Sequence, residues 1–376
     1  MTPITDTRPK LAWIQALRGI AVVLVVLTHA RYFFLDTPSW ELAEQWLRPG
    51  AMGVDLFFVI SGFIMVYTTR HMAGTPADAV DFLVRRFARI WPLYALITVV
   101  WLTVNNLGPG WLRNPSQIKA LMLSLSFQPV NLEKAPFFDP ALPLGWTLNF
   151  EMYFYLVFGL CLLLGRWRLL MLAGWIVLTV ILLPAVKRDL SFDILTNFHF
   201  SLGYLNLMTN PIILEFLAGV GIGWLFLQEW FRLRSQTVAR HVVFLALCAA
   251  VWALWGGPAN FHGPKQWGAV AALMVLALAL ASKTVTLVPP AVLVWLGTIS
   301  FSLYLTHTTT QALVHHAVAA IGGEVHSWGH VLLSTAVAIS AAAAVYHYLE
   351  VRLSNASTAA LRALSLVMLK RIAAKT

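Results

Sequence analysis

Charged residues are scarce in this sequence, and cysteine is nearly absent. Asp, Glu, Lys and Arg make up 11% of the 376 residues, whereas soluble domains contain about 25%. The composition therefore excludes an ordinary soluble protein. The two cysteines, Cys161 and Cys248, lie far apart in apolar runs and do not indicate a disulfide framework. There is also no HExxH motif and no His pair at i, i+4 with a third ligand, so no metal site is predicted.

Apolar residues dominate the chain instead. They make up 59% of it, and the mean hydropathy is +0.74. Runs of the length that crosses a bilayer as a helix recur along the sequence. We therefore expect an all-α fold, a polytopic transmembrane bundle of about ten helices. The expected spans are 11–34, 51–70, 89–107, 146–165, 167–186, 204–228, 240–256, 267–282, 291–318 and 330–351. The run 118–127 is too short to span and is expected to be a half-helix or a re-entrant segment.

The distribution of basic residues predicts the orientation of this bundle. With the N-terminus inside, eighteen of the 26 Lys and Arg residues lie on the inner side, and cytoplasmic loops carry such an excess. Both termini are therefore expected in the cytoplasm. A membrane-embedded domain is expected over 1–352. Residues 353–376 are expected to form a basic cytoplasmic tail, lying on the inner leaflet or frayed in solvent. The net charge of +10 fits topology and lipid headgroups, so no nucleic-acid partner is expected.

The first apolar run carries two ionisable residues that a plain membrane anchor would not contain. Arg18 and His29 are eleven residues apart, which on a helix is about 16 Å of rise and within roughly 20° of three whole turns. Both side chains therefore project from one face of the helix. Ionisable groups inside a span usually face a bundle interior or a wet cavity. The alternative is an Arg that snorkels to one interface and a His that lies at the other.

Four ionisable residues are predicted at similar depth in the outer half of the membrane. They are His29, Asp55, Glu151 and His307, while Glu215 is placed near the middle. A carboxylate that orients an imidazole fixes its tautomer and raises its basicity, as general base catalysis requires. We expect at least three of the four to line one cavity connected to the inner arginines, with Asp55 or Glu151 orienting His29. The alternative is that isolated carboxylates near the interface are structural.

A group of arginines is predicted at the inner mouth of the bundle. Arg85, Arg86 and Arg89 lie in the stretch RRFARIWPLY, and Arg18 faces the same edge. Because guanidinium groups bind phosphate oxygens bidentately, the group is a candidate phosphate clamp. The alternative is that these residues only follow the positive-inside rule.

Several of these stretches together resemble the motifs of the acyltransferase-3 family of integral membrane acyltransferases. The stretches are the Arg18–His29 pair, GVDLFFVISGF, RRFARIWPLY, GWTLNFEMYFY, EFLAG and ISFSLYLTH, in this order over roughly 11–352. The stretch GWTLNFEMYFY, with its single carboxylate, resembles the bacterial exopolysaccharide O-acetyltransferase branch. Many relatives have two adjacent acids there, where this chain has Met152 after Glu151. Within the motifs, the expected structural and cavity residues are Gly53, Ser61, Gly62, Trp146 and Glu215.

The resemblance implies acyl transfer, most often of acetyl, from acyl-CoA to a sugar hydroxyl of a surface glycan or its lipid-linked precursor. Acetyl-CoA would be the co-substrate, with no metal, in the inner membrane of a bacterium and possibly beside polysaccharide synthesis machinery. His29 would act as a general base or as a covalent acyl carrier. The outer segment 108–145, rich in Pro, Gly and aromatic residues, would form an ordered lid. A secondary transporter or flippase is the competing class, and a scaffold of a synthase complex is a third.

Overall fold

The computed structural model describes residues 11–187 and 190–373, and within these ranges every regular element is a helix. The first half contains α1 (Ala12–Ala30), η1 (Arg31–Phe34), α2 (Trp40–Leu47), η2 (Arg48–Met52), α3 (Gly53–Thr69), α4 (Pro76–Asn105), η3 (Pro109–Arg113), α5 (Pro115–Leu125), α6 (Gly145–Leu162) and η4 (Gly165–Trp167). The second half contains α7 (Arg168–Val177), η5 (Leu178–Leu182), α8 (Leu183–Val186), α9 (Gly203–Met208), α10 (Ile213–Leu227), α11 (Gln236–Trp255), α12 (Trp267–Ser282), α13 (Ala291–Thr298), α14 (Ser300–Ala320), α15 (Trp328–Val345), η6 (Tyr346–Glu350) and α16 (Val351–Ala373). The all-α prediction is confirmed.

Six helices in the described ranges are long and apolar enough to cross a membrane, or seven if the bent pair α13–α14 counts as one span. The chain is therefore a multi-pass membrane protein. Each of the ten predicted apolar runs forms helix, but α10 and α12 are apolar helices of only 15 and 16 residues. A count of ten spans and the cytoplasmic location of both ends stay predictions.

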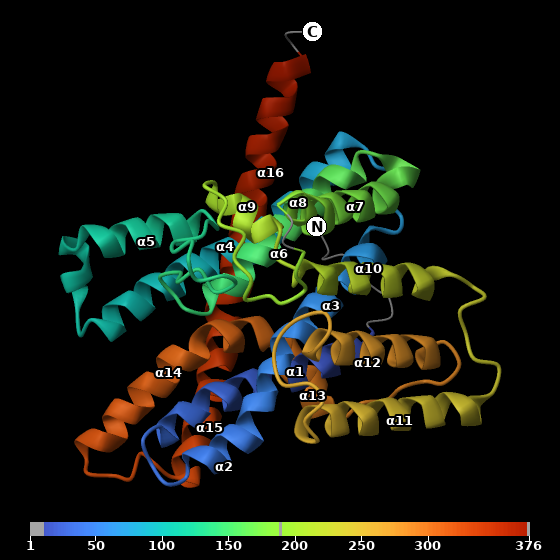
Figure 1. Ribbon diagram of the computed structural model, residues 1–376. Helices are drawn as coiled ribbons and strands as arrows, with labels where there is room; N and C mark the ends of the chain where they lie inside the picture. The colour runs from blue at the N-terminus through green and yellow to red at the C-terminus, as the bar shows by residue number, and fades with distance from the viewer. Residues whose placement is uncertain (1–10, 188–189, 374–376) are drawn as a thin grey trace.

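The bundle is built around α1 and α3. Helix α3 packs on α10, α1 packs on α13 and α3, and α12 lies between α10 and α11 along one flank (Figure 1). On the other flank α4 packs against α6 and α16. The functional residues named above therefore come from the centre of the molecule, where α1, α3, α4, α6 and α14 meet.

Local sequence signals explain how several of the helices begin. Helix α4 starts with a capping box, in which Thr75 and Asp78 bond each other's backbone N–H groups, and Pro76 occupies the first helical position. Ser235 and Ser327 cap α11 and α15 through their hydroxyl groups. These caps satisfy N–H groups of the first turn and mark the residue at which each helix begins.

Glycines allow the central helices to approach to backbone contact. A Cβ on Gly62 would lie 2.1 Å from the carbonyl oxygen of Phe216, and one on Gly219 would lie 2.0 Å from that of Val59. A Cβ on Gly53 would lie 2.3 Å from a carbonyl oxygen of α1. Real Cβ atoms do not come so close, and small residues at such contacts are how membrane helices pack tightly. Helix α3 is therefore held rigidly between α1 and α10.

The predicted tail, as far as the structure describes it, is helical. Helix α15, η6 and α16 follow one another without a gap, so the expected boundary at 352 falls inside a helical run. Helix α16 packs on α4, where Arg362 donates to Asp81 at 2.6 Å, and then projects beyond the other helices (Figure 1). Whether this helix lies on the inner leaflet stays a prediction.

Candidate functional site

A cavity rich in arginine opens between α1, α3, α4, α6 and α14, and we call it the arginine cavity. Its polar lining consists of Arg18, Ser61, Arg86, Arg89, Thr147, Glu151, Tyr155, Ser300 and Tyr304, and apolar residues of α3, α4, α6 and α14 complete it. Three guanidinium groups face one carboxylate, so the lining carries an excess of positive charge. Such a cavity favours an anionic ligand.

Hydrogen bonds hold the polar side chains of the arginine cavity in place. Arg18, on α1, donates at 2.8 Å to the hydroxyl of Ser300, the first residue of α14 after its break with α13. Glu151 accepts from the Tyr155 hydroxyl and, at 3.3 Å, from Ser61. The guanidinium of Arg86 lies over the Tyr155 ring, 5.2 Å from its centroid. Glu151 and Arg86 therefore both contact Tyr155, and among the described residues Glu151 forms no ion pair with an arginine that would neutralise either group.

Arg85 is the one predicted arginine that does not line this cavity. It is exposed and pairs with Asp81, one turn earlier on α4. Successive residues on a helix are turned by about 100°, so Arg85 and Arg86 point in different directions. The structure thus groups Arg18, Arg86 and Arg89 and separates Arg85 from them.

A second cavity lies at another level of α1, and we call it the histidine cavity. It is lined by His29, Arg31, Arg48, Trp146, His262 and Trp267, with Val25, Thr28, Tyr32, Ala51, Val54, Phe137, Leu144, Phe261 and Tyr304. Phe137 and Leu144 come from the predicted lid. Val54 and Tyr304 line both cavities, so these two side chains form the wall between them. The separation of Arg18 and His29 along α1, about 16 Å of helix rise, sets the cavities at different depths.

The two imidazoles His29 and His307 are in contact, and their hydrogen bonds define their tautomers. His307 Nδ1 lies 2.8 Å from the carbonyl oxygen of Tyr304, so Nδ1 carries the proton and Nε2 accepts. His307 Nε2 lies 3.3 Å from His29 Nδ1, which is also 2.9 Å from the carbonyl oxygen of Val25. His29 Nδ1 is therefore the donor. In the neutral ring this leaves a lone pair on His29 Nε2, on the opposite edge from these contacts.

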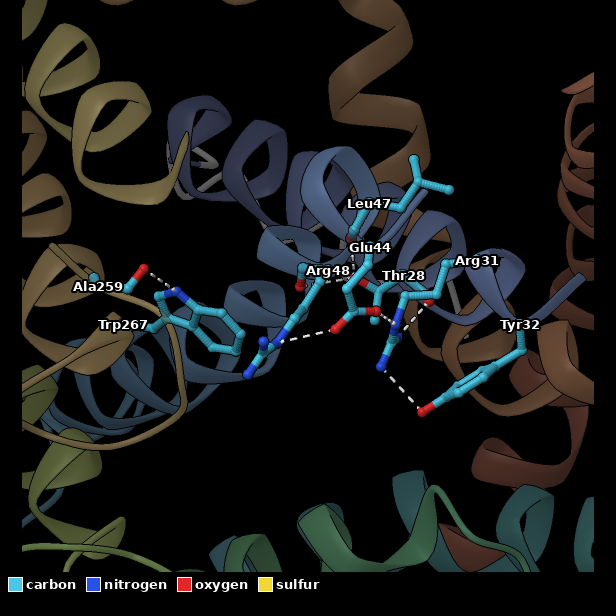
Figure 2. A network of polar contacts seen from close by, with 8 residues as sticks. All are labelled: Thr28, Arg31, Tyr32, Glu44, Leu47, Arg48, Ala259 and Trp267. Atoms are coloured by element: carbon cyan, nitrogen blue, oxygen red, sulfur yellow. Dashed lines mark hydrogen bonds and ion pairs between the residues drawn. The ribbon is translucent and has the colours of Figure 1, made fainter. Parts of the chain in front are cut away.

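The rim of the histidine cavity is a network of polar contacts (Figure 2). Glu44 accepts from Arg31 Nε at 2.8 Å and lies 3.5 Å from Arg48 Nε. Arg31 also donates to the Tyr32 hydroxyl at 3.0 Å, and Trp267 donates to a backbone carbonyl at 3.0 Å. One carboxylate thus serves two guanidinium groups, which leaves a positive charge at the rim beside aromatic rings.

Asp55 and Glu215 lie behind this cavity and do not line it. Asp55 is fully buried, and its Oδ2 is 2.6 Å from His262 Nδ1 while its Oδ1 accepts from the Gly263 N–H at 3.1 Å. Glu215 is 1% exposed, and a Cβ on Gly268 would lie 2.4 Å from its Oε1. Neither Glu215 oxygen has a hydrogen-bond partner among the described residues. Both carboxyls therefore pack against the start of α12 and the loop before it.

The prediction that at least three of His29, Asp55, Glu151 and His307 line one cavity is not met by either of these two cavities. His29 lines the histidine cavity and Glu151 the arginine cavity, while Asp55 and His307 line neither. Helix geometry gives the reason. Asp55 and Ser61 are six residues apart, about 240° around α3, so they face different neighbours. The partner of His29 is His307 rather than a carboxylate, and the catalytic roles of all four residues stay predictions.

Three residues that sequence reasoning missed take part in these cavities. His262 lies in the loop 256–266, where no periodicity marks a functional residue. Tyr155 and Tyr304 read as ordinary aromatic residues of apolar helices, although Tyr155 stands four residues after Glu151 and so on the same helix face. Among the described residues, no group of three or more His, Cys, Asp or Glu side chains is arranged to hold a metal ion.

Comparison with known proteins shows which sequences this chain is similar to. A family model described as an acyltransferase domain matches residues 11–347. The exopolysaccharide production protein ExoZ of Rhizobium meliloti (strain 1021) is 33% identical over 276 residues, which cover 73% of this chain and 80% of that protein. The acyltransferase MdmB of Streptomyces mycarofaciens is 27% identical, with coverage of 85% and 84%.

A third relative is longer than this chain. The putative peptidoglycan O-acetyltransferase YrhL of Bacillus subtilis (strain 168) is 26% identical over 90% of the chain, which spans 54% of that protein. No solved structure matches.

Proposed function

The chain belongs to the acyltransferase-3 family, and from this premise we propose that it transfers an acetyl group from cytoplasmic acetyl-CoA to a sugar hydroxyl of an exopolysaccharide or its lipid-linked precursor. The chain is an O-acyltransferase of the membrane. The names of the relatives support the finer proposal, since one is an exopolysaccharide production protein and another a putative O-acetyltransferase. The proposed location is the bacterial inner membrane, beside polysaccharide synthesis machinery.

The arginine cavity supports the proposed donor. Acetyl-CoA carries phosphates, and Arg18, Arg86 and Arg89 offer guanidinium groups that bind phosphate oxygens in pairs. The thin pantetheine arm would then lead the thioester inward along α3 toward Val54 and Tyr304. Glu151, held by Tyr155 and Ser61, would offset part of the mutual repulsion of the three arginines. The inner side of the membrane is assigned to this cavity by the positive-inside rule.

The histidine cavity supports the proposed acceptor. Its lining combines Trp146 and Trp267, whose ring faces suit the apolar face of a sugar, with Arg48 and histidines that bond hydroxyl groups. His29 Nε2 is the proposed reacting nitrogen, because His307 occupies the other edge of the ring and fixes its orientation. His307 is thus proposed to position His29.

One observation carries the proposal: the two cavities lie at different depths and share only Val54 and Tyr304 as lining residues. A transferase that takes its donor from one side of a membrane and its acceptor from the other needs this arrangement. The acyl group alone would cross the wall, from the arginine side to His29.

The direct test uses purified protein in proteoliposomes with radiolabelled acetyl-CoA. Label should pass to polysaccharide or to its lipid-linked precursor extracted from the source bacterium, and ester-linked acetyl should be lost from the surface polysaccharide of a deletion strain. The proposal is overturned if no label leaves acetyl-CoA, or if the deletion strain keeps its acetyl content. Label that enters a different acceptor would keep the transferase and reject the glycan.

A further inference from the structure

His262 forms a buried pair with Asp55 at the histidine cavity, and nothing in the sequence motifs accounts for it. Its side chain is 9% exposed, and its Nδ1 lies 2.6 Å from Asp55 Oδ2. Asp55 is fully buried and receives a second hydrogen bond from the Gly263 N–H at 3.1 Å. His262 lines the same cavity as His29. Two imidazoles from distant parts of the chain therefore face one space.

The contacts of His262 hold it in one orientation. Trp267 and Trp146 meet its ring edge to face, with centroids 5.0 and 5.7 Å away. The Asp55 carboxylate accepts at Nδ1, so in the neutral ring Nδ1 carries the proton and Nε2 carries the lone pair. A carboxylate at Nδ1 also stabilises the imidazolium that forms when Nε2 takes a proton. The pair has the chemistry of an oriented general base.

A relay through His29 needs such a second base. Once His29 Nε2 is bonded to an acyl group it has no lone pair and cannot accept the proton of the attacking hydroxyl. His307 cannot serve either, because its Nδ1 bonds backbone carbonyls, its Nε2 accepts from His29, and it does not line the cavity. His262 is the other imidazole among the described lining residues.

We propose that His262 is the base that deprotonates the acceptor hydroxyl, with Asp55 as its positioning residue, while His29 carries the acyl group. This rests on the proposed function. In the first step His29 Nε2 attacks the thioester carbon, the C–S bond breaks, and the CoA thiolate takes a proton from water.

In the second step His262 Nε2 takes the hydroxyl proton and the acceptor oxygen bonds the acyl carbon. The bond between that carbon and His29 Nε2 breaks, and its electron pair returns to the nitrogen. His262 then releases its proton to water, which balances the proton taken up by the thiolate.

The test separates the two steps with the full-length protein and His262→Asn, whose side-chain amide keeps a donor for Asp55. The donor step is measured as exchange of labelled CoA into acetyl-CoA in proteoliposomes without acceptor. The acceptor step is measured as transfer of labelled acetyl to endogenous polysaccharide in membranes of the deletion strain. We expect exchange within about 3-fold of wild type and a loss of transfer of at least ~100-fold. His29→Asn should lose both, and His241→Asn, on an exposed face of α11, should lose neither.

Two further measurements separate a base from a merely structural residue. Added imidazole should restore part of the transfer of His262→Ala, because a free base can occupy the vacated space. Asp55→Asn should lower kcat for transfer by more than ~10-fold and leave KM for acetyl-CoA within about 2-fold. Normal transfer by His262→Asn, or loss of its exchange to the level of His29→Asn, overturns the proposal. If the wild-type protein transfers acetyl but does not exchange labelled CoA into acetyl-CoA, the proposal is overturned and the proposed function stands. If the wild-type protein transfers no acetyl to polysaccharide, the proposed function itself is removed.

Discussion

The two cavities differ in how their charged groups are held. In the arginine cavity, Arg86 reaches Glu151 by way of Tyr155, and among the described residues neither Arg86 nor Arg89 forms an ion pair, so the cations remain available to a ligand. In the histidine cavity, by contrast, both imidazoles are locked by a partner at Nδ1, His29 by His307 and backbone, His262 by Asp55. Cations without an ion-pair partner suit a region that binds and releases a charged donor. Fixed rings suit a region where bonds form and break, because a misplaced reacting group is costly.

The largest effect is expected from the reacting nitrogen. His29→Ala should lower acetyl transfer by at least ~100-fold, because it removes the nitrogen proposed to react, while the small volume change leaves folding intact. The measurement is label transfer per mole of protein that elutes as a single species in detergent. Near-normal turnover in this variant would remove His29 from the reaction and with it the functional distinction between the cavities.

A smaller and selective effect is expected on the arginine side. Arg86→Ala and Arg89→Ala should each raise KM for acetyl-CoA by about 10-fold, since a hydrogen bond to a charged group contributes about 1.5–3 kcal/mol. The loss should be milder with a short acetyl thioester that lacks the nucleotide.

Arg85→Ala is the matched control for these two variants. It has the same residue type on the same helix but does not line the cavity. Equal losses with both donors, or an equal loss in Arg85→Ala, would mean that these arginines serve topology rather than phosphate binding.

The wall between the cavities can be tested through the packing of α3. Gly62→Ala should lower the free energy of unfolding by about 1–3 kcal/mol, because its Cβ would meet the backbone of α10 at 2.1 Å. The rates of both the donor step and the acceptor step should fall together. Gly221→Ala on α10, with nothing within 4 Å of its Cβ, should change neither stability nor activity. A Gly62 variant that impaired only one step would show that the two cavities do not depend on a common wall.

The smallest effect is expected far from both cavities. Arg362→Ala removes the pair between α16 and Asp81, whose side chains are 50% and 33% exposed. Exposed pairs contribute less than ~1 kcal/mol, so the melting temperature should fall slightly and both KM values should be unchanged. A large loss of donor binding would show that α16 sets the position of the arginines on α4.

The sequence was sufficient for the helices and for three of the four predicted arginines, Arg18, Arg86 and Arg89, but not for the neighbours of each functional group. Apolar runs locate helices because burial and span length have a simple periodicity. Depth along a helix is also readable, so the Arg18–His29 separation could be derived. Direction around one helix does not place residues of different helices relative to one another, and His29, Asp55, Glu151 and His307 lie on four separate helices.

His262 shows what such reasoning cannot reach. Its contact with Asp55 joins positions 207 residues apart and comes from a loop, where no repeat fixes the direction of a side chain. The sequence indicated that His307 is a buried polar residue. Its contact with His29, however, depends on how α14 packs on α1. A tertiary contact of this kind is a property of the packed bundle, and only coordinates supply it.

The break between α13 and α14 has a consequence for amide hydrogen exchange. The two helices meet at 74°, and Leu303 donates to Ile299 at 2.9 Å at the start of the new helix. The N–H groups of the first turn of α14 that precede Leu303 have no partner within that helix. Ser300 is nevertheless buried, and both Ser300 and Phe301 line the arginine cavity. Deuterium should therefore reach these amides through that cavity, in the middle of the bundle. A molecule seated there would slow the exchange, so these few backbone protons serve as a built-in reporter of whether the donor side is filled.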